Sequence, residues 1–345
     1  MGVKSIQISI DSGTTFRTLP GNSGELSNDA GSIDDTIFGQ NFKSSQTGLI
    51  NWTVKANGFY KGFAGYVAKI KKSGSTTAFT GEAMSLVSGK TYKITDATKN
   101  VWDRTVTPTI YDNAVDHTAD VLSIDFLFGR VTFKSAYTPT GPITADGSYF
   151  PMTQVAKAQE FTLTQTTNPI DTTDFETAQG NSGNRAFEYG LQTVALDLSG
   201  VYATGNGYLA ALQARGELVI EINPDGSELS VARGFFKPMS QGQSGNVGAL
   251  EKETNKFELS VPSTPDTLQR PFGWVHASGT TLNQSVQDAL TAWEGLTTVQ
   301  VKYLADGTHG ATGDAIMSDL TLKGGLESMN DFTVNFQGTG EATIL

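Results

Sequence analysis

Three histidines and two acidic pairs are the residues of this 345-residue chain whose types and spacing could support chemistry. His117, His276 and His309 are the only histidines, and none lies four residues from another or beside a close carboxylate pair of the kind that suits zinc. We therefore expect solvated loop histidines and no metal ion. Cysteine is absent, which excludes disulfide, thiol and iron–sulfur chemistry.

The acidic pairs are Asp34 with Asp35, and Asp171 with Asp174. Either pair could be interpreted as a calcium site or as two carboxylates for acid–base catalysis, but neither segment fits the twelve-residue calcium loop. Both pairs occur at the same point of a repeated unit, whereas a catalytic pair would more naturally occur once. A structural or interface role is favoured, and an enzyme such as a glycosidase is kept as a weaker alternative.

Two further motifs resemble known sites only superficially. Residues 89–91 read Gly-Lys-Thr, like the end of a phosphate-binding loop, but Met84 stands where that loop requires glycine. Short Gly-x-Ser-Gly sequences at 21–24, 180–183 and 242–245 resemble the nucleophile turn of some serine proteases, and three copies are expected by chance in a chain rich in glycine and serine. We assign no catalytic residue, no cofactor site and no metal ligand.

Aromatic and basic residues are the remaining candidates. Four tryptophans could form a stacking platform for sugars or bases: Trp52, Trp102, Trp274 and Trp293. Trp52 belongs to an alternating strand pattern and Trp293 to a helix stripe, so core packing is expected for these large side chains. The only basic cluster, Lys69, Lys71 and Lys72, is too small for a nucleic-acid groove.

Composition limits the possible partners. Hydrophobic residues make up 38% and charged residues 17%, and the formal net charge is −11, from 24 basic minus 35 acidic residues. This balance opposes tight binding to DNA phosphates or anionic lipid. No apolar run approaches a membrane helix, and the first residues lack a signal-peptide core. We expect a soluble protein of about two domains that is made in a cytoplasm.

The elements that must position these residues are mostly strands. Alternation of apolar with polar residues predicts a β-hairpin over 121–133 and strands at 193–198, 218–222, 299–303 and 332–336. A helical apolar stripe occurs in only two segments, GYLAALQARG (207–216) and SVQDALTAW (285–293), the second opening with a serine able to cap it. The fold class predicted is all-β with two short helices.

One structural unit begins twice. GLINWTVKANGFY from Gly48 and GLQTVALDLSGVY from Gly190 match without a gap at an offset of 142 (190 minus 48). Related acidic stretches precede them at 33–38 and 170–175. Each is followed by a polar loop, which is longer in the second copy.

The ending of the unit also occurs twice, as a helix, a strand with an Asp-Gly turn, and two further strands. The Asp-Gly turns at Asp225 and Asp306 lie 81 residues apart (306 minus 225). The simplest interpretation is an insertion, with tandem domains as the competing one. The insertion divides the chain into a discontinuous domain of residues 1–62 plus 275–345, a connecting segment with the hairpin at 63–158, an inserted domain at 159–263, and a linker at 264–274.

The inserted copy resembles the tail tube (major tail) proteins of bacteriophages with long, non-contractile tails. The resemblance is carried, in order, by PIDTTDFETAQGNSG, GLQTVALDLSGVY, GYLAALQARG, LVIEINPDGSELSVARGFF and GALEKETNKFELSV. It covers 159–263 well, whereas the discontinuous copy matches in element order but weakly in residues. Residues 63–158 depart from the single-domain pattern, so the resemblance gives that segment no role.

The resemblance implies a β-sandwich flanked by one short helix per domain, with two tube-like domains per chain. Strands of neighbouring subunits would join into a barrel that lines a channel, and rings would stack into a tube. Single-domain members of the family form hexameric rings. We infer from the duplication that three chains could supply six domains in a trimer with pseudo-six-fold symmetry, with a hexamer as the alternative.

The implied partners are further copies of the chain, the tape-measure protein, and tail-tip and terminator proteins, with DNA passing through the lumen without specific binding and no membrane. The implied location is the virion tail, assembled in the host bacterial cytoplasm, in an infectious virus or a gene-delivery particle. The alternative function is a β-sandwich binding module, such as a carbohydrate-binding, adhesion or decoration protein.

Overall fold

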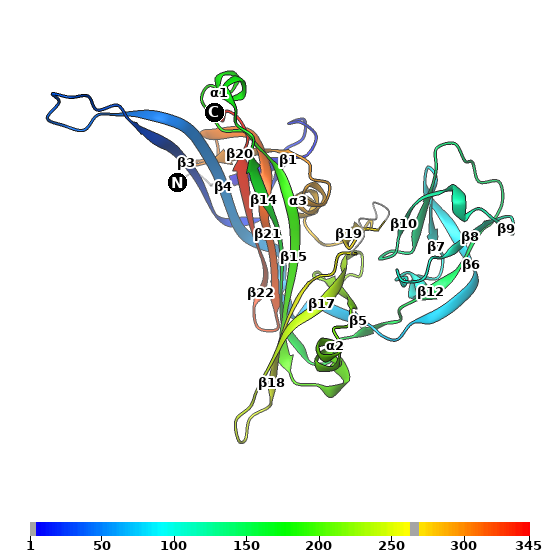
Figure 1. The fold of residues 1–345 in the computed structure, drawn as a ribbon. Helices are drawn as coiled ribbons and strands as arrows, with labels where there is room; N and C mark the ends of the chain where they lie inside the picture. The colour runs from blue at the N-terminus through cyan, green and yellow to red at the C-terminus, as the bar shows by residue number, and fades with distance from the viewer. Residues whose placement is uncertain (1–4, 263–268) are drawn as a thin grey trace. The chain divides into compact units, whose positions relative to one another are not determined.

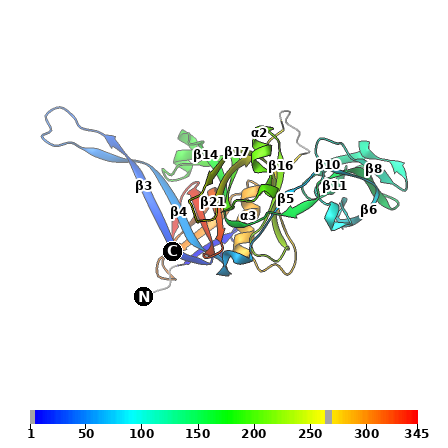
Figure 2. The same ribbon diagram turned by 90° about the horizontal axis from the view of Figure 1, so that it is seen from below.

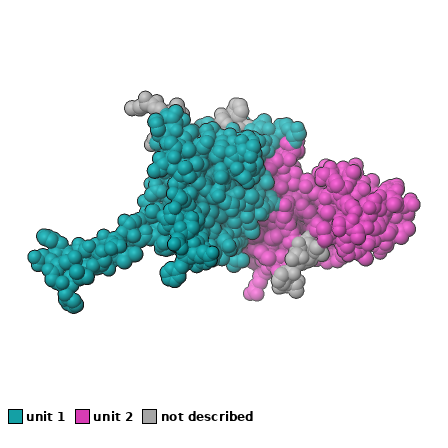
Figure 3. All heavy atoms as spheres, turned by 90° about the horizontal axis from the view of Figure 1, so that it is seen from above, with its two compact units in different colours: residues 1–67, 160–196, 278–345 teal, residues 68–159, 197–277 magenta. Residues whose placement is uncertain are grey.

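A computed structural model describes residues 5–262 and 269–345. Its chain divides into two compact units (Figure 3). Unit 1 comprises Met1–Val67, Glu160–Leu196 and Ser278–Leu345, and unit 2 comprises Ala68–Gln159 and Asp197–Ala277. The described residues are mainly strand with three short α-helices, so the predicted all-β class is confirmed.

Unit 1 is built from long antiparallel strands (Figure 1). Its strands are β1 (Ser5–Ser9), β2 (Arg17–Thr18), β3 (Gly21–Asp34), β4 (Ser45–Ala64), β14 (Ala158–Asp171), β15 (Phe187–Val201), β20 (Val299–Leu304), β21 (Gly310–Gly325), β22 (Met329–Gly338) and β23 (Thr343–Ile344). Strands β14 and β15 each have one end in unit 2. The pairing order is β20-β21-β22-β4-β3, and β14 pairs with β21. Strands β3 and β4 form a long hairpin that projects from the rest of unit 1 (Figures 1 and 2).

The apolar sides of these strands pack with helix α3 (Gln284–Glu294), on which eight residues are buried. The helix begins with Asn283 at the N-cap, and no side chain caps it. The predicted cap Ser285 is wrong, because this serine is a buried residue of the first turn. Asp288 on the same helix forms an ion pair with Arg17, at 2.6 Å between the guanidinium nitrogen and the carboxylate oxygen. The other helices are α1 (Phe175–Gly180), which was not predicted, and α2 (Tyr208–Gln213) in unit 2.

Unit 2 contains a seven-stranded sheet in the order β10-β11-β7-β6-β12-β8-β9. Its strands are β6 (Thr77–Ser88), β7 (Thr91–Ile94), β8 (Thr109–Asp112), β9 (Val115–Asp116), β10 (Val121–Asp125), β11 (Arg130–Phe133) and β12 (Ile143–Tyr149). The predicted hairpin at 121–133 is confirmed as β10 paired with β11. Phe126 and Phe128 lie buried in the connection between the two strands. The segment 63–158 thus forms a sheet and not only a connection with a hairpin, and the core around Trp102 also contains Val219 and Phe235 from outside the segment.

The other strands of unit 2 are β5 (Lys69–Ser73), β13 (Met152–Gln154), β16 (Leu218–Asn223), β17 (Ser230–Ser244), β18 (Lys252–Leu259) and β19 (Phe272–His276). A buried ion pair joins β16 to β17, since Arg233 lies 2.6 Å from Glu221. Arg233 also donates to the main-chain oxygen of Leu127 at 2.8 Å, which ties this group of strands to the seven-stranded sheet. Lys71 adds a second cation 3.1 Å from Glu221, so the buried carboxylate is doubly paired.

The compact units divide the chain differently from the predicted domains. The segment 160–196, expected inside the inserted domain, clusters with the termini because β14 pairs with β21 over seven positions. Part of the predicted linker, residues 264–268, lies outside the described residues. Its last residues are not a linker, because Phe272 and Trp274 alternate inward in β19, which pairs with β17.

Candidate functional site: a polar strand face and two strand edges

One face of the unit 1 sheet is continuously polar. The opposite face is apolar, as in the buried row Leu163, Leu322 and Phe332 on three adjacent strands. One position along the strands, the row that points to the polar face consists of Thr164, Thr321, Thr333, Asn57 and Ser23. The hydroxyl of Thr333 donates to Asn57 at 2.9 Å, and the Asn57 amide donates to the Ser23 hydroxyl at 3.2 Å. The strand alternation therefore presents a hydrogen-bonded surface of hydroxyl and amide groups.

Charges on this face alternate in sign from strand to strand. Lys55 stands opposite Glu25 on β3, and Lys323 opposite Asp331 on β22. Burial raises the pKa of Asp331. Burial also raises the pKa of Asp319, and the Thr321 hydroxyl and the charge of Lys55 offset this rise only in part. A mixed surface of this kind offers no concentrated positive field for phosphate groups.

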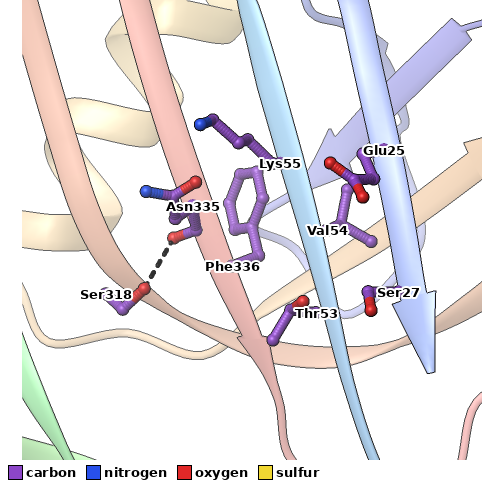
Figure 4. Close-up of a pocket in the computed structure, with 8 residues that line it drawn as sticks. All are labelled: Glu25, Ser27, Thr53, Val54, Lys55, Ser318, Asn335 and Phe336. Carbon is purple, nitrogen blue, oxygen red and sulfur yellow. Dashed lines mark hydrogen bonds between the residues drawn. The ribbon is translucent and has the colours of Figure 1, made fainter. Parts of the chain in front are cut away.

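A shallow hollow of about 360 Å³ lies on the same face (Figure 4). Its lining residues come from β3, β4, β21 and β22: Glu25, Ser27, Thr53, Val54, Lys55, Ser318, Asn335 and Phe336. The Ser318 hydroxyl donates to the main-chain oxygen of Asn335 at 3.2 Å, the bond drawn in Figure 4. The lining holds no histidine or cysteine, and its ionisable side chains are Glu25 and Lys55. The hollow can hold water and hydrogen-bonding groups.

The hairpins β21–β22 and β17–β18 have the same internal register. Each contains one register shift, between Met317 and Asp319 in the first and between Pro238 and Ser240 in the second. These positions differ by 79 residues (317 minus 238), and so do their partners on β22 and β18, Phe336 and Phe257 (336 minus 257). Strands β20 and β16, which precede these hairpins, also correspond. Ala315 pairs with the first residue of β20. Phe236 lies 79 residues earlier (315 minus 236) and pairs with the first residue of β16.

The two strands β3 and β14 also correspond. The acidic stretches align at an offset of 137 (171 minus 34), which places Asp29 at the position of Thr166. Asp29 stands opposite Asn51 on β4. The residue 142 positions after Asn51 is Thr193, and the hydroxyls of Thr166 and Thr193 are 2.5 Å apart. Both offsets found in the sequence therefore lead to the same cross-strand pair.

The acidic pairs named from the sequence accept hydrogen bonds from groups of the loops in which they lie. Asp34 accepts from the Thr36 amide at 3.0 Å and hydroxyl at 2.6 Å, which lower the pKa of its carboxyl. Asp174 is the N-cap of α1, where the Thr177 amide donates to it at 2.6 Å and, with that residue's side chain, lowers its pKa. Asp35 accepts from the Gln46 amide at 2.8 Å, and Asp171 accepts from the amide of Thr173 at 3.0 Å and pairs with Arg185 at 2.7 Å. The structure brings neither pair together with a third acidic or histidine group, and no cluster of three such residues suited to a metal occurs among the described residues.

The histidines are scattered. His309 is an exposed loop residue beside Asp306 at 2.7 Å, as expected. His117 precedes a short 3₁₀ turn and packs against Tyr137 with ring centroids 4.7 Å apart. The loop expectation is wrong for His276, which lies in β19, 2.6 Å from the Ser230 hydroxyl. Ser230 is fully buried, and His276 is partly exposed.

The tryptophans are all buried, which confirms the core interpretation for Trp52, Trp102, Trp274 and Trp293. The Gly-Lys-Thr sequence lies at the β6–β7 turn, with Gly89 at φ +53° and Lys90 donating to the main-chain oxygen of Ser135 at 2.6 Å.

The three Gly-x-Ser-Gly sequences lie in three different places, at the start of β3, after α1 and at the end of β17. In the basic cluster, Lys69 and Lys71 pair with Glu228 at 3.0 and 3.5 Å.

Two strand edges, one in each unit, were not predicted from the sequence. Among the described residues, β3 pairs only with β4, and the second half of β17, residues 240–244, pairs only with β18. The residues of both segments are largely exposed. Such edges offer main-chain donors and acceptors to another strand. The signal that could have located them is the weak alternation of GNSGELSND, which has few apolar residues on either side.

Comparison with known proteins gives a partial structural match only. No helix of the described residues is long and apolar enough to cross a membrane. No family model and no curated protein sequence matches the chain. Among solved structures, 32% of the chain is similar to 85% of a chain in the "Virion of native gene transfer agent (GTA) particle", with 13% identity and a TM-score of 0.27. A chain in the "Tail of empty GTA particle computed with helical refinement, C6 symmetry" matches 32% of this chain over 84% of its own length, with 15% identity and a TM-score of 0.28.

Proposed function

We propose that this chain is a structural subunit of a phage-type tail tube, which assembles into stacked rings around a channel for DNA. The observation that carries the proposal is the pairing of β14 with β21 over Glu160 to Thr166 and Gly325 to Asp319. It joins the first strand of one copy of the repeated unit to the hairpin of the other copy. One chain thus already contains a junction of the kind that a ring of such units must repeat.

The polar face suits the wall of a channel. Its hydroxyl and amide groups bond to one another across the strands, and its lysines stand opposite carboxylates. With a net charge of −11 on the chain, phosphate groups meet no excess of cations that could hold them by counterion release. DNA and a tape-measure protein would pass such a wall without specific binding.

Exposed apolar side chains at corresponding loops favour contacts between rings. Phe38, at the tip of the β3–β4 hairpin, and Phe175, at the start of α1, differ by the offset of 137 (175 minus 38), and both are almost fully exposed. Ile37 and Phe42 are exposed beside Phe38. Apolar groups gathered at a projecting tip are typical of an interaction surface. We assign these loops to contacts with the next ring of the tube.

A ring of three chains would contain six copies of the unit, with pseudo-six-fold symmetry. Tail-tip and terminator proteins would bind its ends, and the assembled particle would be the virion tail or a related gene-delivery particle. No catalytic role is proposed. The alternative, a sugar-binding module, has less support because all four tryptophans are buried.

Negative-stain electron microscopy of the purified chain, alone and with a nucleating tail-tip complex, tests the proposal. We expect rings or tubes whose class averages show three-fold symmetry with six similar lobes. A folded protein that stays monomeric under every assembly condition would contradict the proposed function. Six full chains in a ring would keep the function and refute the trimer.

A further inference from the structure

The outer edge of β3 is a long hydrogen-bonding edge with no partner among the described strands of unit 1. Residues 23–29 pair with β4 on one side, and no described strand pairs with them on the other. The corresponding residues of β14, 160–166, are paired on both sides, with β15 and with β21. A long exposed edge of this kind pairs readily with another chain unless it is blocked. Residues 23–29 contain no proline, which is one common block.

The outer edge of β17 is the counterpart of the edge on β21 that β14 occupies. Asp319 to Gly325 hold β14, and the residues 79 positions earlier are 240–246. This segment reads Ser-Gln-Gly-Gln-Ser-Gly-Asn, and it carries no charge and no β-branched or large apolar residue. A neutral, exposed segment leaves room for the charged side chains of an incoming strand.

We infer that β3 of one chain pairs antiparallel with residues 240–246 of a second copy, in the register that β14 and β21 use within one chain. The inference rests on the proposed function and specifies its subunit contact. Thr162 stands opposite Lys323 in the internal pair. Subtracting 137 from the first and 79 from the second places Glu25 opposite Ser244. The same subtraction applied to Thr166 and Asp319 places Asp29 opposite Ser240.

This contact is heterologous, because each chain contributes a different edge. A heterologous contact can repeat around a ring until the ring closes, whereas pairing of β3 with β3 would give only a closed dimer. Like charges also disfavour the second arrangement, since Glu25 and Asp29 would face the same acidic residues. Opposite residues 240–246 they meet hydroxyl, amide and glycine positions instead.

Cysteine cross-linking can test the register because the chain contains no cysteine. Two single variants, Glu25→Cys and Ser244→Cys, are mixed, assembled and oxidised. Opposite residues of an antiparallel pair lie about 4.5 to 5.5 Å apart at Cα, within disulfide range. The register control mixes Glu25→Cys with Ser240→Cys, four residues along the strand, or about 13 Å away. The matched internal control is Thr162→Cys/Lys323→Cys in one chain.

We expect a covalent dimer from the first mixture, at about ten-fold or more the yield of the register control, as the distance dependence of disulfide formation requires. The internal control should lose its free thiols without any change in the number of chains linked. Dimers from Glu25→Cys alone would show β3–β3 pairing and overturn the inference.

Rings seen by microscopy together with an uncross-linked first mixture would also overturn this inference, while leaving the proposed function intact. Folded protein that forms neither rings nor cross-links would overturn both.

Discussion

Strands β14 and β3 occupy corresponding positions but differ in their neighbours. β14 is paired on both sides, whereas β3 pairs with β4 alone among the described strands. The same contrast separates β21, which receives β14, from the second half of β17, where the corresponding edge is unpaired among the described strands. Under the proposed function, the β14–β21 pairing and the free edges of β3 and β17 are the satisfied and the open form of one assembly contact.

The largest expected effect is a loss of folding stability when the large and small side chains at corresponding positions of the two copies are exchanged. A Cβ on Gly338 would lie 2.1 Å from the Trp52 ring, so Gly338→Leu cannot fit beside that indole. The corresponding residues of the other copy are Leu259 (338 minus 79) and Val194 (52 plus 142), a large residue and a small one in exchanged places. Trp52→Val and Gly338→Leu should each lower the free energy of unfolding by about 3 kcal/mol or more.

The double variant Trp52→Val/Gly338→Leu should lose clearly less stability than the sum of the single losses, because the new leucine fills the space of the indole. Urea unfolding of the four proteins measures this coupling. Additive losses would show that the two positions do not exchange volume, which would weaken the correspondence of the hairpins.

Proline at corresponding positions of β14 and β3 should affect different properties, namely folding stability in β14 and ring formation in β3. Thr162→Pro interrupts a strand that is paired on both sides, and we expect a loss of about 2 to 3 kcal/mol in unfolding experiments. Glu25→Pro lies on an edge strand, where proline is better tolerated. The isolated subunit should lose less stability, while ring formation, seen by sedimentation, should be abolished. Normal rings from Glu25→Pro would contradict a role for this edge.

The burial of Asp319 should appear in the pH dependence of stability. Its pKa is raised in the folded protein, so the folded state holds the proton more tightly than the unfolded state does. Stability is therefore lost as the pH rises from the ordinary aspartate pKa, about 4, to the raised value. Asp319→Asn should remove this loss and so raise the stability at pH 7. Ser240→Ala, at the corresponding open position, should change neither the stability nor its pH profile.

The smallest effects are expected from the ion pairs in the loops after the two strands. Arg185 pairs with Asp171 at 2.7 Å and Lys43 with Asp34 at 3.3 Å, and both pairs are exposed to solvent. Arg185→Ala and Lys43→Ala should each cost less than about 1 kcal/mol in thermal unfolding, and less at high salt. A larger loss from either would show that its loop is part of the folded core.

The sequence predicts the elements that bury an apolar side and misses those that do not. Strands such as 332–336 were predictable because Phe332, Val334 and Phe336 point into one core. Strand β3 was not, because its few apolar residues, such as Leu26, are only half-buried. In the seven-stranded sheet, β6 (TAFTGEAMSLVS) buries only Phe79 and Met84, too few for a clear alternation.

The candidate surface was less predictable than the fold. The offsets of 137 and 142 are visible in the sequence, but the shared register shift at Ser318 and Met239 requires knowledge of strand partners. The open edges are properties of pairing, and their trace in the residue types is limited to the weak alternation of GNSGELSND in β3. The pairing of β14 with β21 depends on contacts between residues about 160 positions apart, which local patterns do not encode.

Amide hydrogen exchange of the isolated subunit and of the assembled form tests the central claim most directly. Residues 160–166 and 319–325 should be protected in both states, because their pairing lies within one chain. Residues 23–29 and 240–246 should keep some fast-exchanging amides in the subunit and slow by about a hundred-fold or more on assembly. Assembly that leaves both of these segments exchanging as fast as before would contradict the account.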